Sequence, residues 1–249
     1  MRTISLAIAY CGDAYKGFQC QPNETTVQGV IEKVLSKIYV HDVKVKYSGR
    51  TDAGVNAKKQ IVTYFDYNKV PLDKLVGILN NRLPDNVSVE SAKITDEGFD
   101  PRRNALEREY EYWLYFSNEN PFISNYMHYQ QDLDIVAMEK ALKEVVGEHD
   151  FSKLCSEPDR YKSTVRQIFD ATLTKEEYNF VGYFGECVKI KVVGNSFLYH
   201  MVRKLVGLLL EVGRGNLPLS DFILVVDGSK LYSWKMAPPK ALFLSNIIY

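Results

Sequence analysis

The chain has 249 residues, of which 46% are hydrophobic and 25% are charged, so it has the composition of a folded globular protein with one large domain or two small ones. Its 31 Lys and Arg balance its 31 Asp and Glu, and a net charge of zero argues by itself against a nucleic-acid partner. No apolar stretch is long enough to cross a bilayer, so no membrane segment is expected. The four cysteines form no Cys-x-x-Cys pair and no zinc-like cluster, which favours free thiols and a cytoplasmic protein.

The first hundred residues alternate between strand and helix patterns. Period-two alternation predicts strands, and apolar residues three and four apart predict helices. The predicted elements are a strand over 1–10, a helix over 27–38 capped by Asn23, Thr25 or Thr26, strands over 43–47 and 60–65, a helix over 72–79 and a strand at 87–89. This β-α-β-β-α-β order is typical of a ferredoxin-like unit.

The second half repeats the pattern with different residues. The predicted elements are a strand over 108–116, a helix over 133–146, strands over 165–173 and 187–193, a helix over 197–212, a short helix after Pro218 and an apolar run over 242–249. We therefore expect an α+β protein with two ferredoxin-like halves, residues 1–103 and 104–249. The halves are expected to share an extended, mostly antiparallel sheet with a central cleft.

A glycine-bracketed loop over residues 48–56 carries the first candidate for chemistry. It contains Gly49-Arg50-Thr51-Asp52-Ala53-Gly54 between two predicted strands. One interpretation is a turn in which Asp52 only accepts a hydrogen bond from a backbone N–H. The other is that Asp52, a carboxylate held on a tight loop beside a cation, acts as nucleophile or general base.

The predicted helix over 197–212 is apolar around most of its circumference and has one narrow polar stripe. Arg203 lies on that stripe, and an Arg on a buried helix needs a carboxylate partner because an unpaired buried charge is costly. Glu211 is two helical turns away, which leaves Asp52 of the other half as a candidate. The alternative is that Arg203 reaches solvent from the helix end.

The strand over 108–116 places Arg108, Tyr110 and Tyr112 on one face. Alternating aromatic residues usually only pack a sheet, and we keep that interpretation for Tyr112. Tyr110 lies where the pattern changes from charged to apolar, so its ring could face a cleft and stack on a planar ligand.

The chain resembles the tRNA pseudouridine synthase A (TruA) family over essentially its whole length. The resemblance rests on motifs in the family's order: Tyr10 to Gln19, Thr26 to Gly29, Gly49 to Val55, Asn81 to Pro84, Phe99 to Arg102 with Arg108 and Tyr110, Gly147 to Phe151, Phe197 to Gly207, and Leu242 to Leu244.

The resemblance implies the pseudouridine synthase fold and an enzyme that isomerises uridine to pseudouridine at positions 38, 39 and 40 of the anticodon stem-loop of tRNA. It also implies a homodimer that docks a tRNA across both subunits, with no cofactor and no metal. Asp52 aligns with the catalytic aspartate, Arg50 with an arginine that fills the space left by the flipped base, and Tyr110 with a tyrosine that stacks on uracil and acts in proton transfer. Arg203 aligns with the arginine that pairs with the catalytic carboxylate, and Leu242 with an apolar residue of the pocket.

Further substrate contacts are expected from Thr51, Gln19, Lys58, Arg102 and Arg108. Local charge supports an RNA partner despite the neutral total. Residues 40–60 carry five basic against two acidic side chains and residues 189–214 five against one, whereas residues 119–150 carry two against seven. A positive groove on a neutral molecule predicts that tRNA affinity falls as salt rises.

Three alternatives stay open from the sequence. The chain could be a non-catalytic tRNA-binding or RNA-folding module on the same fold, or a pseudouridine synthase with a different choice of uridine. A carboxylate-based hydrolase would need a second acid facing Asp52, and the acids nearest to motifs, Asp100 and Asp150, fit turn or cap roles better.

Overall fold

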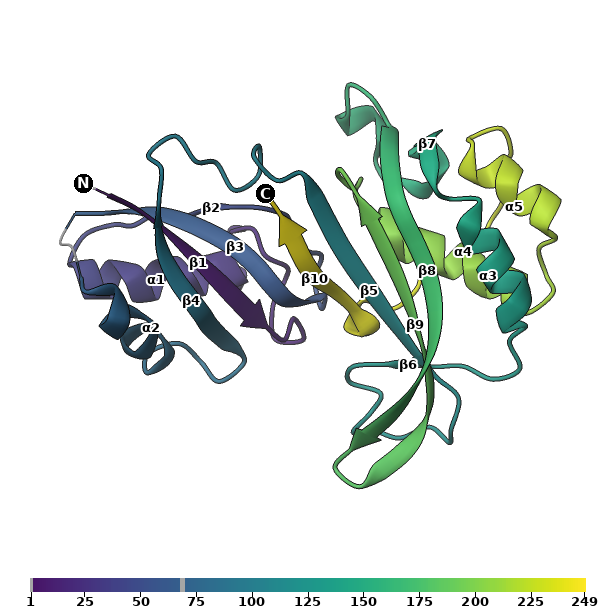
Figure 1. The fold of residues 1–249 in the computed structure, drawn as a ribbon, viewed down its shortest axis with the longest axis horizontal. Helices are drawn as coiled ribbons and strands as arrows, with labels where there is room; N and C mark the ends of the chain where they lie inside the picture. Colours follow the sequence, from purple (N-terminus) through teal and green to yellow (C-terminus); the bar gives the residue numbers. More distant parts are fainter. Residues whose placement is uncertain (1, 68–69) are drawn as a thin grey trace. The chain divides into compact units, whose positions relative to one another are not determined.

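A computed structural model describes residues 2–67 and 70–249, and these form two compact units (Figure 1). One unit comprises residues up to Leu106 together with Phe243–Tyr249, and the other comprises Glu107–Leu242. The sequence placed the final apolar run with the second half. The structure groups it with the first unit because β10 (Leu242–Ile248) pairs in parallel with β3 (Asn56–Asp66), with Phe243 opposite Asn56. Met1, counted in the first predicted strand, lies outside the described residues.

The first unit has the predicted β-α-β-β-α-β order. Strand β1 lies between β3 and β4 and is antiparallel to both, while β2 and β10 pair with different parts of β3. Its remaining elements are β1 (Arg2–Tyr10), α1 (Val27–Tyr39), β2 (Lys46–Tyr47), α2 (Leu72–Asn80) and β4 (Val87–Thr95).

Burial explains why these segments pack as one unit. Strand β1 is buried along almost its whole length, because it is central in the sheet, and Leu6 and Ile8 are fully enclosed. Leu35 of α1 and Leu75 of α2 are equally buried. Helix α1 begins after Thr26, whose Oγ1 accepts a hydrogen bond from the Gly29 N–H at 3.3 Å, so Thr26 is the cap among the three predicted candidates.

The second unit contains an antiparallel sheet in the order β5-β9-β8-β7, and β6 pairs in parallel with β5. Helix α3 contacts β8, α4 and α5. The elements are β5 (Glu107–Tyr115), β6 (His128–Tyr129), α3 (Ile135–Lys143), β7 (Gly147–Asp150), β8 (Val165–Phe180), β9 (Tyr183–Gly194), α4 (Met201–Gly213) and α5 (Leu219–Val226), with 3-10 turns at Phe151–Leu154, Pro158–Arg160 and Pro239–Ala241. Figure 1 shows β8 and β9 as a long hairpin, which is longer than the sequence predicted.

Helix α4 begins at Met201, so the prediction of a helix from Phe197 was wrong at its start. His200 has a φ of 67°, in the left-handed region, and cannot continue a right-handed helix toward the N-terminus. The predicted burial around the circumference of α4 is confirmed, since all of its residues are buried except Lys204 and Glu211. In the ranges 2–67 and 70–249, no helix is both long and apolar enough to span a membrane.

Candidate active site

Asp52 lies in the loop between β2 and β3, and the start of this loop is held by a buried side chain. Gln60 of β3 is fully buried, and its Nε2 donates to the Gly49 carbonyl at 2.7 Å. Its Oε1 accepts from the Gly49 N–H at 3.2 Å and from the Ser48 hydroxyl. A single amide thus fixes both backbone groups of Gly49.

The loop that follows β1 supports the Asp52 loop from the other direction. The Tyr10 hydroxyl lies 2.7 Å from Thr51 Oγ1, and the Phe18 N–H donates to the Thr51 carbonyl at 3.1 Å. This approach depends on Gly17, which has a φ of +95° and on which a Cβ would lie 2.8 Å from the Thr51 carbonyl oxygen. Asp52 therefore follows a residue whose backbone and side chain are both held.

The structure leaves Asp52 half-buried, whereas Thr51 is buried and Arg50 is exposed. Arg50 Nε donates to the Tyr47 hydroxyl at 3.4 Å. A partly accessible carboxylate on a rigid loop has the position that a nucleophile needs, because it can meet a substrate without the loop having to reorganise.

The other predicted contacts of the first unit are exposed and polar. Gln19, Lys58 and Arg102 all lie at the surface. Lys58 Nζ lies 5.6 Å from the centre of the Phe243 ring, a cation–π distance. Their exposure fits a role in contacting a large substrate, and that role stays a prediction.

In the second unit, β5 confirms the predicted alternation: Arg108, Tyr110, Tyr112 and Leu114 are all buried. The Tyr110 ring meets Phe197 edge-on, with centroids 5.0 Å apart at 81°. Arg108 Nη1 donates to the Asn195 carbonyl at 2.7 Å. Residues 195–197 thus contact both Arg108 and the ring of Tyr110. Leu242, the last residue of this unit, is also buried.

Arg203 of α4 is 9% exposed, and the segment Trp234–Pro238 binds it through Ala237. Its Nε donates to the Ala237 carbonyl at 2.9 Å, and the Ala237 N–H donates back to the Arg203 carbonyl at 3.1 Å. The segment lies against the helix at Gly207, where a Cβ would be 2.3 Å from the Lys235 carbonyl oxygen. Sequence reasoning missed this segment, although a glycine inside an otherwise apolar helix is a signal of close approach.

Three other polar side chains of the predicted stripe have partners inside the second unit. Lys204 Nζ donates to the Cys155 carbonyl at 2.9 Å, and Glu211 accepts from Arg214 at 2.7 Å. His200 Nδ1 lies 2.8 Å from Ser156 Oγ, as expected for a satisfied histidine. Asp52 and Arg203 lie in different units, so the pairing between them stays a prediction.

The buried Tyr112 and the half-buried His128, which contacts it, both have shifted pKa values. Burial raises the pKa of the Tyr112 hydroxyl above its ordinary value, and the positive charge of Arg203 opposes that shift. Burial, helped by the positive charges of Lys240, Arg214 and Lys235, lowers the pKa of His128 to about 4. Both side chains are therefore uncharged at neutral pH.

The acids considered for a hydrolase have local roles. Asp100 Oδ1 accepts from the backbone N–H groups of Arg102 and Arg103 at 3.0 Å, and Asp150 Oδ1 accepts from the Ser152 N–H at 3.0 Å. The turn and cap interpretations are confirmed for both. In the described part of the chain no group of three or more His, Cys, Asp or Glu side chains is arranged to hold a metal ion.

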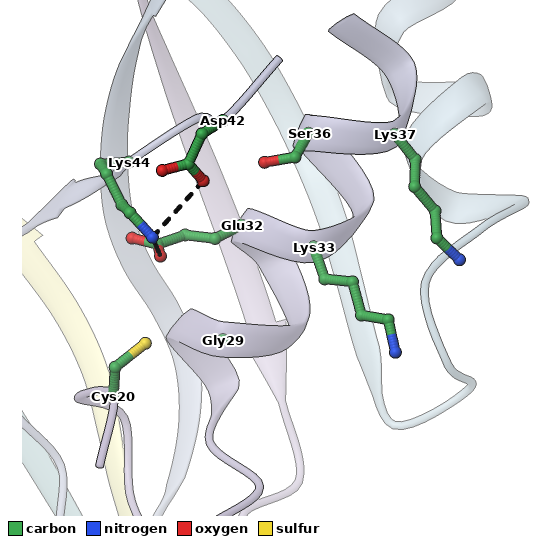
Figure 2. A pocket seen from close by; sticks show the side chains of 8 residues that line it. All are labelled: Cys20, Gly29, Glu32, Lys33, Ser36, Lys37, Asp42 and Lys44. Carbon is green, nitrogen blue, oxygen red and sulfur yellow. Dashed lines mark hydrogen bonds and ion pairs between the residues drawn. The ribbon is translucent and has the colours of Figure 1, made fainter. Parts of the chain in front are cut away.

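A hollow of about 520 Å³ lies beside α1, and none of the predicted site residues lines it (Figure 2). Lys44 Nζ pairs there with Glu32 at 3.1 Å and with Asp42 at 3.5 Å. Its lining comprises Cys20, Gly29, Glu32, Lys33, Ser36, Lys37, Asp42 and Lys44. Basic and acidic groups are mixed in it, so it has no single charge to select a ligand.

The family model that matches this chain is described as tRNA pseudouridine synthase, and it matches residues 6–102 and 141–249. These ranges include the Asp52 loop and α4 with Arg203. The match defines the class of protein: an RNA-modifying isomerase.

Relatives match over their full length. A protein named tRNA pseudouridine synthase A from Caldicellulosiruptor saccharolyticus is 38% identical over 252 residues, covering 100% of both chains. Proteins of the same name from Brevibacillus brevis and Thermodesulfovibrio yellowstonii are 35% and 34% identical, again over 100% of both chains. The chain belongs to the tRNA pseudouridine synthase family, and its activity is the isomerisation of uridine in tRNA.

Proposed function

We propose that this enzyme modifies uridines 38, 39 and 40 in the anticodon stem-loop of tRNA, with Asp52 as its nucleophile. The observation that carries the assignment is the double support of the Asp52 loop by Gln60 and by the Tyr10–Phe18 segment. Such support keeps a carboxylate in one place while the uracil is detached, turned and rejoined.

The reaction needs a group that adds to the substrate and later leaves. The N1–C1′ bond breaks and a C5–C1′ bond forms, and C5 loses a proton while N1 gains one. An ionised Asp52 can form and release the transient covalent bond, attacking either C6 of the base or C1′ of the ribose. No electrons are gained or lost overall, so the reaction needs no redox cofactor.

The family resemblance assigns roles in the reaction to further side chains. Arg203 pairs with Asp52 and orients its carboxylate, and the Tyr110 ring stacks on the uracil and helps to move the C5 proton. Extrusion of the base costs a few kcal/mol, which stacking on Tyr110 and insertion of Arg50 into the vacated space offset. Leu242 lines the apolar side of the pocket.

The remaining contacts are assigned to tRNA itself. Thr51, Gln19, Lys58, Arg102 and Arg108 bind or position the RNA, and a homodimer holds one tRNA across two subunits. Since its substrate is tRNA, the enzyme works in the cytoplasm.

Tritium at uridine C5 gives the direct test, because pseudouridine formation releases it. Asp52→Ala and Asp52→Asn are expected to abolish release while tRNA affinity and thermal unfolding stay close to those of the parent. Release that survives Asp52→Ala would refute the nucleophile assignment. If the parent protein binds tRNA and releases no label, it is a binding module.

The position of the modified uridine in tRNA is tested by a separate experiment. Pseudouridine is mapped in tRNA from cells with and without the protein. Loss confined to positions 38–40 supports the proposal, and loss at other uridines shows a different selectivity.

A further inference from the structure

A chain of hydrogen bonds runs through the second unit and ends on the segment that binds Arg203. The Tyr112 hydroxyl donates to the Pro238 carbonyl at 3.1 Å and lies 3.1 Å from His128 Nδ1. His128 Nε2 lies 2.9 Å from Gln130 Nε2, and Gln130 Oε1 accepts from Arg214 Nη2 at 2.6 Å. The bonds join β5, β6 and the end of α4 to the Trp234–Pro238 segment, so they are tertiary contacts.

The chemistry of the partners sets the direction of every bond. Arg214 can only donate, so Gln130 presents its oxygen to Arg214 and its NH₂ group to His128. His128 Nε2 must then accept, which places its single proton on Nδ1, where it donates to the Tyr112 oxygen. The Tyr112 proton is left for the Pro238 carbonyl. A neutral His128 is the only form that satisfies all four contacts, and its lowered pKa agrees with that form.

The hydrogen bond from Tyr112 to the Pro238 carbonyl lies next to the hydrogen bond from Arg203 to the Ala237 carbonyl. Ala237 and Pro238 are consecutive residues, and Ala237 accepts from Arg203 Nε while Pro238 accepts from Tyr112. The φ and ψ angles of Pro238 lie between these two carbonyls; its own ring fixes φ and the following Pro239 restricts ψ, so the two carbonyls move together. A guanidinium is planar, and fixing its Nε–H therefore fixes the plane of its two terminal nitrogens.

We propose that Tyr112 and His128 are positioning residues, which orient the Arg203 guanidinium through the carbonyls of Pro238 and Ala237. This inference rests on the proposed pairing of Arg203 with Asp52. It explains which residues hold the guanidinium in the orientation that the pairing needs. The role assigned to each side chain involves no contact with the substrate. Their effect is on the rate of the chemical step, because they set the geometry of a group that acts in that step.

Tyr112→Phe removes a single hydroxyl and tests the inference. We expect kcat for label release to fall about 10-fold or more while KM for tRNA stays within about 2-fold. Tyr115→Phe is the matched control: Tyr115 lies on the same strand and is equally buried, and its hydroxyl bonds to Ser124 and the Asn120 N–H, away from the Arg203 segment. Loss of the Tyr115 hydroxyl is expected to lower stability about as much as loss of the Tyr112 hydroxyl does, and to leave kcat unchanged.

A double-mutant cycle with Arg203→Lys separates positioning from a general structural role. If Tyr112 acts through Arg203, adding Tyr112→Phe to Arg203→Lys lowers kcat little further, whereas independent effects multiply. His128→Asn keeps an amide donor near the Nδ1 position and is expected to retain more kcat than His128→Ala.

The outcomes are distinct. Full kcat in Tyr112→Phe, or losses that multiply in the double variant, overturns the positioning role and leaves the function of Arg203 intact. Full kcat in Arg203→Lys overturns this inference, because lysine has no guanidinium plane to orient, and it leaves the proposed charge pair with Asp52 standing, because a lysine ammonium also pairs with a carboxylate.

Discussion

Substitution of Gly17 by alanine probes whether the loop after β1 holds the Asp52 loop in its working position. Gly17 has a φ of +95°, and a Cβ there would lie 2.8 Å from the Thr51 carbonyl oxygen, one residue before Asp52. An L-residue in this region of φ costs about 1–2 kcal/mol. Crowding against a backbone atom adds about 1–3 kcal/mol, so a total loss of about 2–5 kcal/mol is expected.

The displacement is expected to reach the catalytic carboxylate. Ordinary van der Waals contact begins near 3.4 Å, so the Thr51 carbonyl and the alanine must separate by about 0.6 Å. Because a misplacement of about 1 Å can lower a rate about 100-fold, we expect kcat of Gly17→Ala to fall about 10-fold.

Gly215→Ala is the matched control, because Gly215 has a φ of +75° and a methyl group added there would meet open space within 4 Å among the described residues. It carries the backbone strain without the crowding. Urea unfolding and single-turnover label release are measured for both variants. Equal stability losses with unchanged kcat would show that the contact between Gly17 and Thr51 does not hold the Asp52 loop, and the reasoning would be refuted.

Other contacts lead to three further predictions. Gly207→Ala places a Cβ 2.3 Å from the Lys235 carbonyl oxygen, so it should lower stability by about 1–3 kcal/mol and lower kcat, as measured by urea unfolding and label release; unchanged values for both would contradict the close approach. Because the pKa of His128 is about 4 in the folded protein and 6.5 in the unfolded chain, the unfolded chain binds more protons between these values. Stability should therefore fall as pH falls from 6.5 to 4, by about 1–2 kcal/mol after solvent screening of the half-buried ring. His128→Asn should remove this contribution to the pH dependence of stability, as measured by urea titrations at several pH values. The logarithm of tRNA affinity should fall linearly with the logarithm of salt concentration, and Lys58→Gln should reduce the slope by about 1 if Lys58 contacts a phosphate; affinity independent of salt would contradict the positive groove.

Local sequence patterns predicted the elements of the fold well, because periodicity records which face of a segment is buried. The alternation in β5 correctly placed Arg108 and Tyr110 on one face of the strand, which the structure buries, and the spacing in α1 and its Thr26 cap placed that helix. The start of α4 was placed four residues too early. Apolar residues continue upstream of Met201, and only the left-handed backbone of His200 ends the helix there.

The sequence by itself determined the α+β class, the order of elements in the first unit and, through its motifs, membership in the tRNA pseudouridine synthase family. It also identified Arg203 as a buried cation that needs a partner, because burial of a charge follows from helical spacing alone. Only the tertiary structure decided which groups hold Arg203 within the second unit. Its partner there is the Ala237 carbonyl, more than 30 residues away, in a segment that is hydrogen-bonded to Tyr112 and through it to His128. Every residue has a backbone carbonyl, so no residue type indicates which carbonyl will bind Arg203. That choice depends on how distant segments pack.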